Sequence, residues 1–134
     1  MQEKKTALIA GASGIVGRGI AERLVGDGWR VLCASRSGGG HLPGTEGVAV
    51  DLLDAEACAR AVAPHAGITH VFHAAFQPAP SRAAEVAPNL AMLRNVVEPL
   101  DRPGGPLRHV TIMQGGKAYG VHIHPQIAVP ARER

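Results

Sequence analysis

Residues 11–17 read GASGIVG, and this stretch decides the expected fold. It follows the apolar run Thr6–Ala10, which has the length and composition of a strand buried on both faces. It precedes a segment in which Val16, Ile20 and Leu24 recur at helical spacing, with charged residues between them. A strand, a glycine turn and an amphipathic helix in this order predict the first unit of a parallel sheet covered by helices.

The rest of the chain continues to alternate strand-like and helix-like segments. Further strands are expected at Arg30–Ala34, Val48–Val50, Thr69–Ala74 and His109–Met113, with helices over residues 55–62 and 90–100. Asp54 is expected to cap the first of these helices, and Pro88 to lie near the start of the second. Because crossovers between parallel strands are right-handed, the pattern predicts an α/β, Rossmann-like doubly wound parallel sheet in the order 3-2-1-4-5, truncated before the sixth strand.

The three glycines of the turn each have a chemical use in such a fold. Gly11 permits a tight turn, Gly14 lets the backbone approach a pyrophosphate, and Gly17 lets the helix pack close to the strand. The N–H groups at the start of the helix then face the phosphates, which makes Ser13, Gly14, Ile15 and Val16 candidate contacts. The sequence therefore predicts a dinucleotide-binding domain over residues 1–134.

The end of the second strand distinguishes two dinucleotides. Binders of NAD usually place an acidic residue there for the ribose hydroxyls, whereas this chain has Ser35 and Arg36. A guanidinium group offers a planar fork of donors and a permanent charge, which suits a 2′-phosphate. We therefore predict that the cofactor is NADP(H).

Two further segments complete the predicted cofactor site. Asp51 is a candidate acceptor for the adenine amino group, with Leu52 packed on the ring, although Asp51 could equally cap its own turn. Ala75 and Phe76 follow the fourth strand, at the edge where a nucleotide lies in such sheets. Phe76 has an alternative interpretation as an ordinary core residue.

Composition excludes several other classes of protein. The chain is 46% hydrophobic, carries a net charge of +3 and has only 3% aromatic residues, and its basic residues are scattered, so we expect no nucleic-acid partner. No apolar run reaches the length of a membrane span, and we expect no membrane partner.

Cys33 and Cys58 are not in a C-x-x-C pair and are expected to be free thiols in the cytoplasm. His122 and His124 lack further ligands nearby, so no metal site is expected.

Together these motifs resemble the short-chain dehydrogenase/reductase superfamily. The resemblance rests on GASGIVG at 11–17, ASR at 34–36, VDLLD at 50–54, THVFHAAF at 69–76, NLAMLRNVV at 89–97 and MQGGKAYG at 113–120. The last two motifs are similar to those of its atypical or extended branch, in the progesterone 5β-reductase and iridoid synthase-like group. Only the N-terminal part of such proteins is matched.

The resemblance implies an NADPH-dependent reductase that acts on an enone or other small carbonyl compound. It implies that Lys117 is the active-site lysine, that Gln114 lines the nicotinamide site, and that Ser35 and Arg36 contact the 2′-phosphate. Lys117 has an alternative interpretation as a plain loop lysine.

One departure from the superfamily pattern leaves the activity open. Tyr119 is followed four residues later by Ile123, so the usual Tyr-x-x-x-Lys pair is absent. The resembling group takes its catalytic tyrosine from a later helix, which leads us to expect a truncated cofactor-binding part with little activity alone. The alternatives are a non-catalytic NADP(H)-binding or sensing module and a poorly folding fragment. Because the fifth strand would be a sheet edge, we also expect either a homo-oligomer formed through that edge or a C-terminal tail folded over it.

Overall fold

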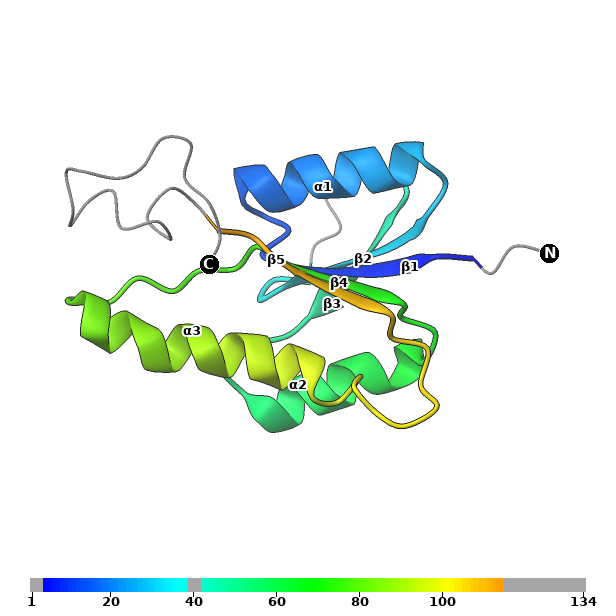
Figure 1. Cartoon of the computed structure of the whole chain (residues 1–134). Coiled ribbons are helices and arrows are strands. Elements are labelled where there is room, and N and C mark those ends of the chain that lie inside the picture. Colours follow the sequence, from blue (N-terminus) through cyan, green and yellow to red (C-terminus); the bar gives the residue numbers. More distant parts are fainter. Residues whose placement is uncertain (1–3, 39–41, 115–134) are drawn as a thin grey trace, which may run out of the picture.

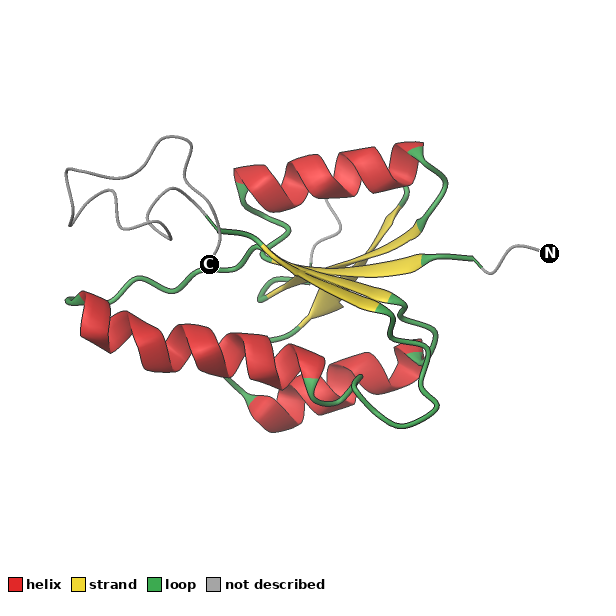
Figure 2. Ribbon diagram, in the orientation of Figure 1, coloured by secondary structure: helices red, strands yellow, loops and turns green. Residues whose placement is uncertain are grey.

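Five parallel strands form one sheet in the computed structural model, which describes residues 4–38 and 42–114. The elements in chain order are β1 (Thr6–Ala10), α1 (Ile15–Gly26), β2 (Arg30–Ser35), β3 (Thr45–Ala49), α2 (Ala55–Val62), the 3-10 turn η1 (Ala63–His65), β4 (His70–His73), α3 (Arg82–Val97) and β5 (His109–Ile112). The strands lie in the order β3-β2-β1-β4-β5, so the predicted fold class and strand order are confirmed. Helix α1 covers one face of the sheet, and α2 and α3 cover the other (Figures 1 and 2).

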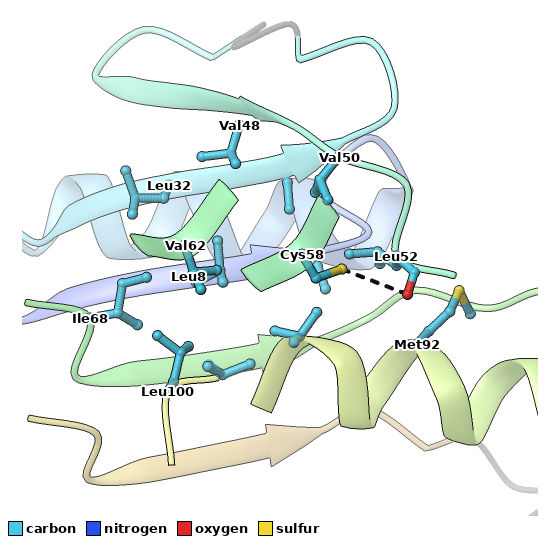
Figure 3. Close-up of a cluster of buried hydrophobic side chains, with 14 residues drawn as sticks. Leu8, Leu32, Val48, Val50, Leu52, Cys58, Val62, Ile68, Met92 and Leu100 are labelled. Carbon is cyan, nitrogen blue, oxygen red and sulfur yellow. Dashed lines mark hydrogen bonds between the residues drawn. The ribbon is translucent and has the colours of Figure 1, made fainter. Parts of the chain in front are cut away.

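Alternate residues of the central strands supply two separate cores. From β1, Leu8 and Ala10 face α2 and α3 in the larger cluster, part of which Figure 3 shows. Ala7 and Ile9 face α1 in the smaller cluster. Because both faces of β1 are covered, the strand is an unbroken apolar run rather than an alternating one.

The predicted starts of two elements are wrong by at least three residues, and the helix expected over residues 90–100 also ends earlier, at Val97. Strand β3 begins at Thr45 instead of Val48, because its backbone pairs with β2 from Thr45 onward although only Val48 is buried. An edge strand with one buried side chain gives almost no apolar signal in the sequence.

Helix α3 also begins earlier than expected. Ser81 caps it by accepting a hydrogen bond from the Ala84 N–H at 3.1 Å, so Pro88 lies inside the helix rather than near its start. A proline within a helix removes one backbone hydrogen bond but does not prevent a well-capped helix from continuing. Asp54 caps α2 as predicted, by accepting from the Ala57 N–H at 3.0 Å.

Candidate functional site

A cleft lies at the carboxyl edge of the sheet, where the loops that follow β1 to β4 meet. Its volume is about 230 Å³, and it is lined by Gly11, Ser13, Ala34, Ser35, Arg36, Val50, Asp51, Leu52, Leu53, Ala75, Phe76, Gln77 and Met92. The chain reverses its winding direction between β1 and β4, so this edge is the topological switch point of the sheet. Parallel α/β sheets bind their ligands at that point.

Two glycines of the GASGIVG turn are required by the packing of the protein itself. Gly11 has a φ of +81°, and a Cβ built on it would lie 2.6 Å from the Ala75 nitrogen. A Cβ on Gly17 would lie 2.8 Å from the Gly11 carbonyl carbon. The turn therefore presses against both the loop after β4 and the first turn of α1.

Gly14 differs from the other two glycines of the turn. A Cβ on Gly14 would meet nothing closer than the Gly11 oxygen at 3.6 Å, and its φ of −80° is open to any residue. The fold itself has room for a side chain here. Close approach of a ligand would give this position a reason to be glycine.

The amino end of α1 is uncapped, in contrast to the other two long helices. Its N-cap, Gly14, provides no side-chain hydrogen bond, and its first turn has no acidic residue. Helices α2 and α3 each have a side-chain cap and an acidic residue in the first turn. The first N–H groups of a helix have no partner within the helix, so α1 leaves donors and a partial positive charge for an anion.

Ser35 and Arg36 form the wall of the cleft beyond β2. The Ser35 hydroxyl accepts a hydrogen bond from the Gly38 N–H at 3.1 Å, which shapes the turn that follows the strand. Arg36 is exposed and has no salt bridge within the described residues. Because the guanidinium group is not paired with a carboxylate there, it can bind a phosphate without breaking an ion pair first.

Asp51 does cap its own turn, as one of its two interpretations states. Its Oδ1 accepts a hydrogen bond from the Leu53 N–H at 3.0 Å. The Oδ2 atom has no hydrogen bond within the described residues, so the carboxylate retains an acceptor that lines the cleft. Leu52 is only 9% exposed, and it joins the larger core while lining the cleft.

Phe76 is not an ordinary core residue. Its side chain is 65% exposed, whereas Ala75 beside it is half-buried. The alternative interpretation of Phe76 is therefore wrong, and the ring is available to a ligand at the rim of the cleft.

Four other candidate residues that the structure describes are not among the residues that line this cleft. Gly14, Ile15 and Val16 lie at the start of α1, where Ile15 is 93% exposed and Val16 is 51% exposed. Gln114 is exposed at the end of the described chain, and Lys117 lies outside the described residues.

Sequence reasoning missed five lining residues: Ala34, Val50, Leu53, Gln77 and Met92. Four of them are direct neighbours of predicted site residues in the sequence, and could have been found by including those neighbours. Met92 comes from the middle of α3, and only the packing of that helix brings it to the cleft.

Other kinds of site are absent from the part of the chain that the structure describes. No helix within residues 4–38 and 42–114 is long and apolar enough to cross a membrane. In the same residues, no group of three His, Cys, Asp or Glu side chains could hold a metal ion. Cys33 and Cys58 are free and buried, and burial raises the pKa of both thiols.

The sheet order and the glycine turn at the switch point define a Rossmann-like nucleotide-binding protein. More narrowly, the chain belongs to the NAD dependent epimerase/dehydratase family, which matches residues 7–121. The predicted membership of the short-chain dehydrogenase/reductase superfamily is confirmed.

Three similar proteins show the breadth of this relationship. The chain is 30% identical to "Short chain dehydrogenase gsfE" of Penicillium aethiopicum, over 96% of this chain and 37% of that protein. It is 31% identical to "3-oxo-Delta(4,5)-steroid 5-beta-reductase" of Arabidopsis thaliana, over 87% of this chain and 32% of that protein. A short-chain dehydrogenase from Burkholderia cenocepacia, solved in complex with NADP, is 27% identical with a TM-score of 0.59, over 78% of this chain and 52% of that one. The chain thus spans about a third of the length of the curated relatives it matches.

Proposed function

We propose that this chain binds NADP(H) in the cleft and forms the cofactor-binding part of an NADPH-dependent reductase of carbonyl or enone compounds. The observation that carries the proposal is the uncapped amino end of α1, reached through a turn whose middle glycine has no packing reason to be glycine. The family of the chain and the NADP-bound neighbour support a nicotinamide cofactor.

The start of α1 and each wall of the cleft have a role in this proposal. The N–H groups of Ile15 and Val16 bind the diphosphate at the start of α1. The Asp51 Oδ2 accepts a hydrogen bond from the adenine amino group, and Leu52 packs against the ring. Arg36 binds the 2′-phosphate. The turn that carries Arg36 is held by the Ser35 hydroxyl, which accepts a hydrogen bond from the Gly38 N–H.

The chemistry needs groups beyond the cleft. NADPH supplies a hydride when it is bound, and the family resemblance assigns Gln114 and Lys117 to the nicotinamide side. Lys117 would hydrogen-bond the ribose of that half and lower the pKa of a nearby proton donor. We also propose that the protein works in the cytoplasm, where its two thiols would stay reduced.

Titration with NADPH and NADH tests the proposal. Arg36→Ala should weaken NADPH binding by about ten- to a hundredfold, the value of a charge-assisted hydrogen bond, and leave NADH binding within about twofold. Arg60→Ala is the matched control, because Arg60 is an exposed arginine of α2 whose one ion pair among the described residues is with Glu56 at 3.7 Å. Equal affinity for both cofactors, unchanged in Arg36→Ala, would remove the NADP assignment, and absence of binding would remove the whole proposal.

A second candidate function is a non-catalytic NADP(H)-binding or sensing module. The described residues that line the cleft provide for the cofactor, which is all that such a module needs. Oxidation of NADPH in the presence of a simple enone, followed by absorbance, tests the chain for chemistry. Enone-dependent oxidation excludes the module, whereas tight NADPH binding with no oxidation is the result expected both of the module and of a cofactor-binding part with little activity alone.

Self-association through β5 remains part of the proposal. In the described residues β5 pairs only with β4, and its end exposes Ile112 at 47% and Met113 at 43%. Such an edge can pair with a second copy. Light scattering should report a dimer, and Ile112→Lys should shift it toward the monomer; a monomer in both would contradict this expectation.

A further inference from the structure

We propose that Asn89 and Asn95 of α3 are positioning residues that hold the two opposite walls of the cleft in place for the adenosine half of the dinucleotide. The inference rests on the proposed function, and it adds residues that do not themselves line the cleft. Each asparagine uses its side-chain amide to hold the backbone of a loop that does line it.

Asn95 holds the wall beyond β3. Its Nδ2 donates a hydrogen bond of 2.9 Å to the carbonyl oxygen of Leu52, a residue 43 positions earlier in the chain. The Cys58 thiol donates weakly to the same oxygen at 3.8 Å and to the Asp51 oxygen at 3.6 Å (Figure 3 shows the Cys58–Leu52 bond). These donors turn the carbonyl groups toward the helices, which leaves the Asp51 carboxylate on the cleft side.

Asn89 holds the wall beyond β4 at two points. Its Oδ1 accepts a hydrogen bond of 2.9 Å from the Gln77 N–H, and its Nδ2 donates to the Gln77 oxygen at 2.8 Å. The Nδ2 also donates to the Glu85 oxygen at 2.8 Å, within α3 itself. Both backbone groups of Gln77 are thereby fixed, and with them the segment that places Phe76 at the rim.

Neighbouring positions on the surface of one helix provide both contacts. Asn89, Met92 and Asn95 follow one another at intervals of three residues, so Met92 adjoins both asparagines, which lie about 120° apart around the axis of α3. The two asparagines are about 9 Å apart along the helix axis. Met92, between them, is 5% exposed and lines the cleft directly. Helix α3 therefore sets the distance between the wall beyond β3, at Leu52, and the wall beyond β4, at Gln77. This distance is the width of the cleft that is available to the ligand.

Binding of adenosine 2′,5′-bisphosphate and of NADPH, measured by calorimetry, tests this role. Asn89→Ala and Asn95→Ala should each weaken both ligands by about three- to tenfold, the value of one or two neutral hydrogen bonds. The matched control is Thr69→Val, which removes buried hydrogen bonds to Thr6 at the opposite end of the sheet. That variant should lose at least as much thermal stability while its dissociation constants change by less than about twofold.

Amide hydrogen exchange gives a second readout, at the backbone of the wall itself. The Gln77 amide should lose protection in Asn89→Ala but keep it in Asn89→Asp, because the carboxylate still accepts from the Gln77 N–H. Should an alanine variant fail to fold, Asn89→Asp and Asn95→Asp remove the same side-chain donors at constant size and should weaken binding in its place.

The outcomes separate the inference from the function on which it rests. If the unaltered chain binds neither ligand, the proposed function fails and the inference with it. If the unaltered chain binds and the asparagine variants bind equally well, the inference alone is overturned. It is also overturned if Thr69→Val weakens binding as much as they do, since the effect would then follow stability.

Discussion

The two ends of the sheet differ in how their polar groups and apolar side chains are used. At the amino end, the Thr69 hydroxyl bonds both the N–H and the oxygen of Thr6 at 3.0 Å, and Trp29 packs edge-on against His70 at 4.7 Å. At the carboxyl end, Phe76 is 65% exposed at the rim of an open cleft, and Ile15 at the start of α1 is 93% exposed. At the amino end these side chains bind each other, whereas at the carboxyl end large apolar side chains stay exposed.

The difference separates stability from binding along the direction of the strands. Loops at the carboxyl ends of parallel strands converge, so a ligand there can contact several strands at once. Within the described residues, the amino end has no uncapped helix beside a glycine turn, and the Thr69–Thr6 hydrogen bonds there join β1 to the start of β4. Substitutions at the two ends should therefore have different signatures.

The largest effect is expected at Gly17, where a single substitution should affect both stability and binding. A Cβ there would lie 2.8 Å from the Gly11 carbonyl carbon and 2.9 Å from the Ala12 Cα, so Gly17→Ala must push α1 off the turn. We expect a loss of about 3 kcal/mol in the free energy of unfolding, together with loss of NADPH binding. Urea unfolding and NADPH titration measure the two quantities.

Gly19 provides the matched control for Gly17. It lies in the same helix, is exposed and has nothing within 4 Å of a built Cβ. Gly19→Ala should raise stability by about 0.5–1 kcal/mol, because alanine is the better helix former. If both alanine variants behaved alike, the close packing of the turn against α1 would not be the reason for Gly17.

The second largest effect is expected at the amino end, in Thr69→Val. The Thr6 N–H is buried and bonds the Thr69 hydroxyl, so the substitution leaves a donor without its acceptor. This should cost about 2 kcal/mol in the free energy of unfolding and leave the NADPH dissociation constant unchanged. A clear weakening of NADPH binding would contradict the separation of the two ends.

Local sequence patterns were sufficient for the fold and for most of the cleft. The strand, turn and helix around Gly11 are determined by neighbouring residues, and the handedness of crossovers then limits the order of the strands. The start of β3 at Thr45 could not be seen, because its pairing with β2 depends on backbone groups that carry no side-chain signal. Asn95 could not be found either, since its partner Leu52 is 43 residues away and only packing brings them together.

A third, smaller effect concerns pH and His73, at the carboxyl end of β4. The side chain is 6% exposed, its Nδ1 has no hydrogen-bond partner within the described residues, and burial lowers the pKa of the imidazole below 6.5. Between the unfolded-state pKa and the lower folded-state pKa, the unfolded chain binds a proton that the folded chain does not. Stability is therefore complete above pH 6.5 and is lost as pH falls through that interval.

Urea unfolding at pH 8.0 and pH 5.5 measures this loss. His73→Leu, which has no titrating group, should lose less stability than the unaltered chain between the two values. Some pH dependence should remain in the variant, because burial also lowers the pKa of His70. An identical loss in both proteins would show that His73 is protonated equally in the folded and unfolded states.

The smallest effect is expected for the ion pair at the amino end. The Arg30 Nε lies 2.6 Å from the Glu46 Oε2, and this hydrogen bond lowers the pKa of the carboxyl group. Because the Glu46 side chain is 51% exposed, solvent screens the pair, and Glu46→Gln should cost less than about 1 kcal/mol in the free energy of unfolding. The contribution of the pair to stability should be complete above the ordinary carboxyl pKa of 4.5 and should fall as pH drops below it.

Glu56→Gln, in the longer and more exposed Arg60 pair, is the control and should change nothing measurable. A loss from Glu46→Gln larger than that from Thr69→Val would mean that charge pairing, rather than buried hydrogen bonding, secures this end of the sheet.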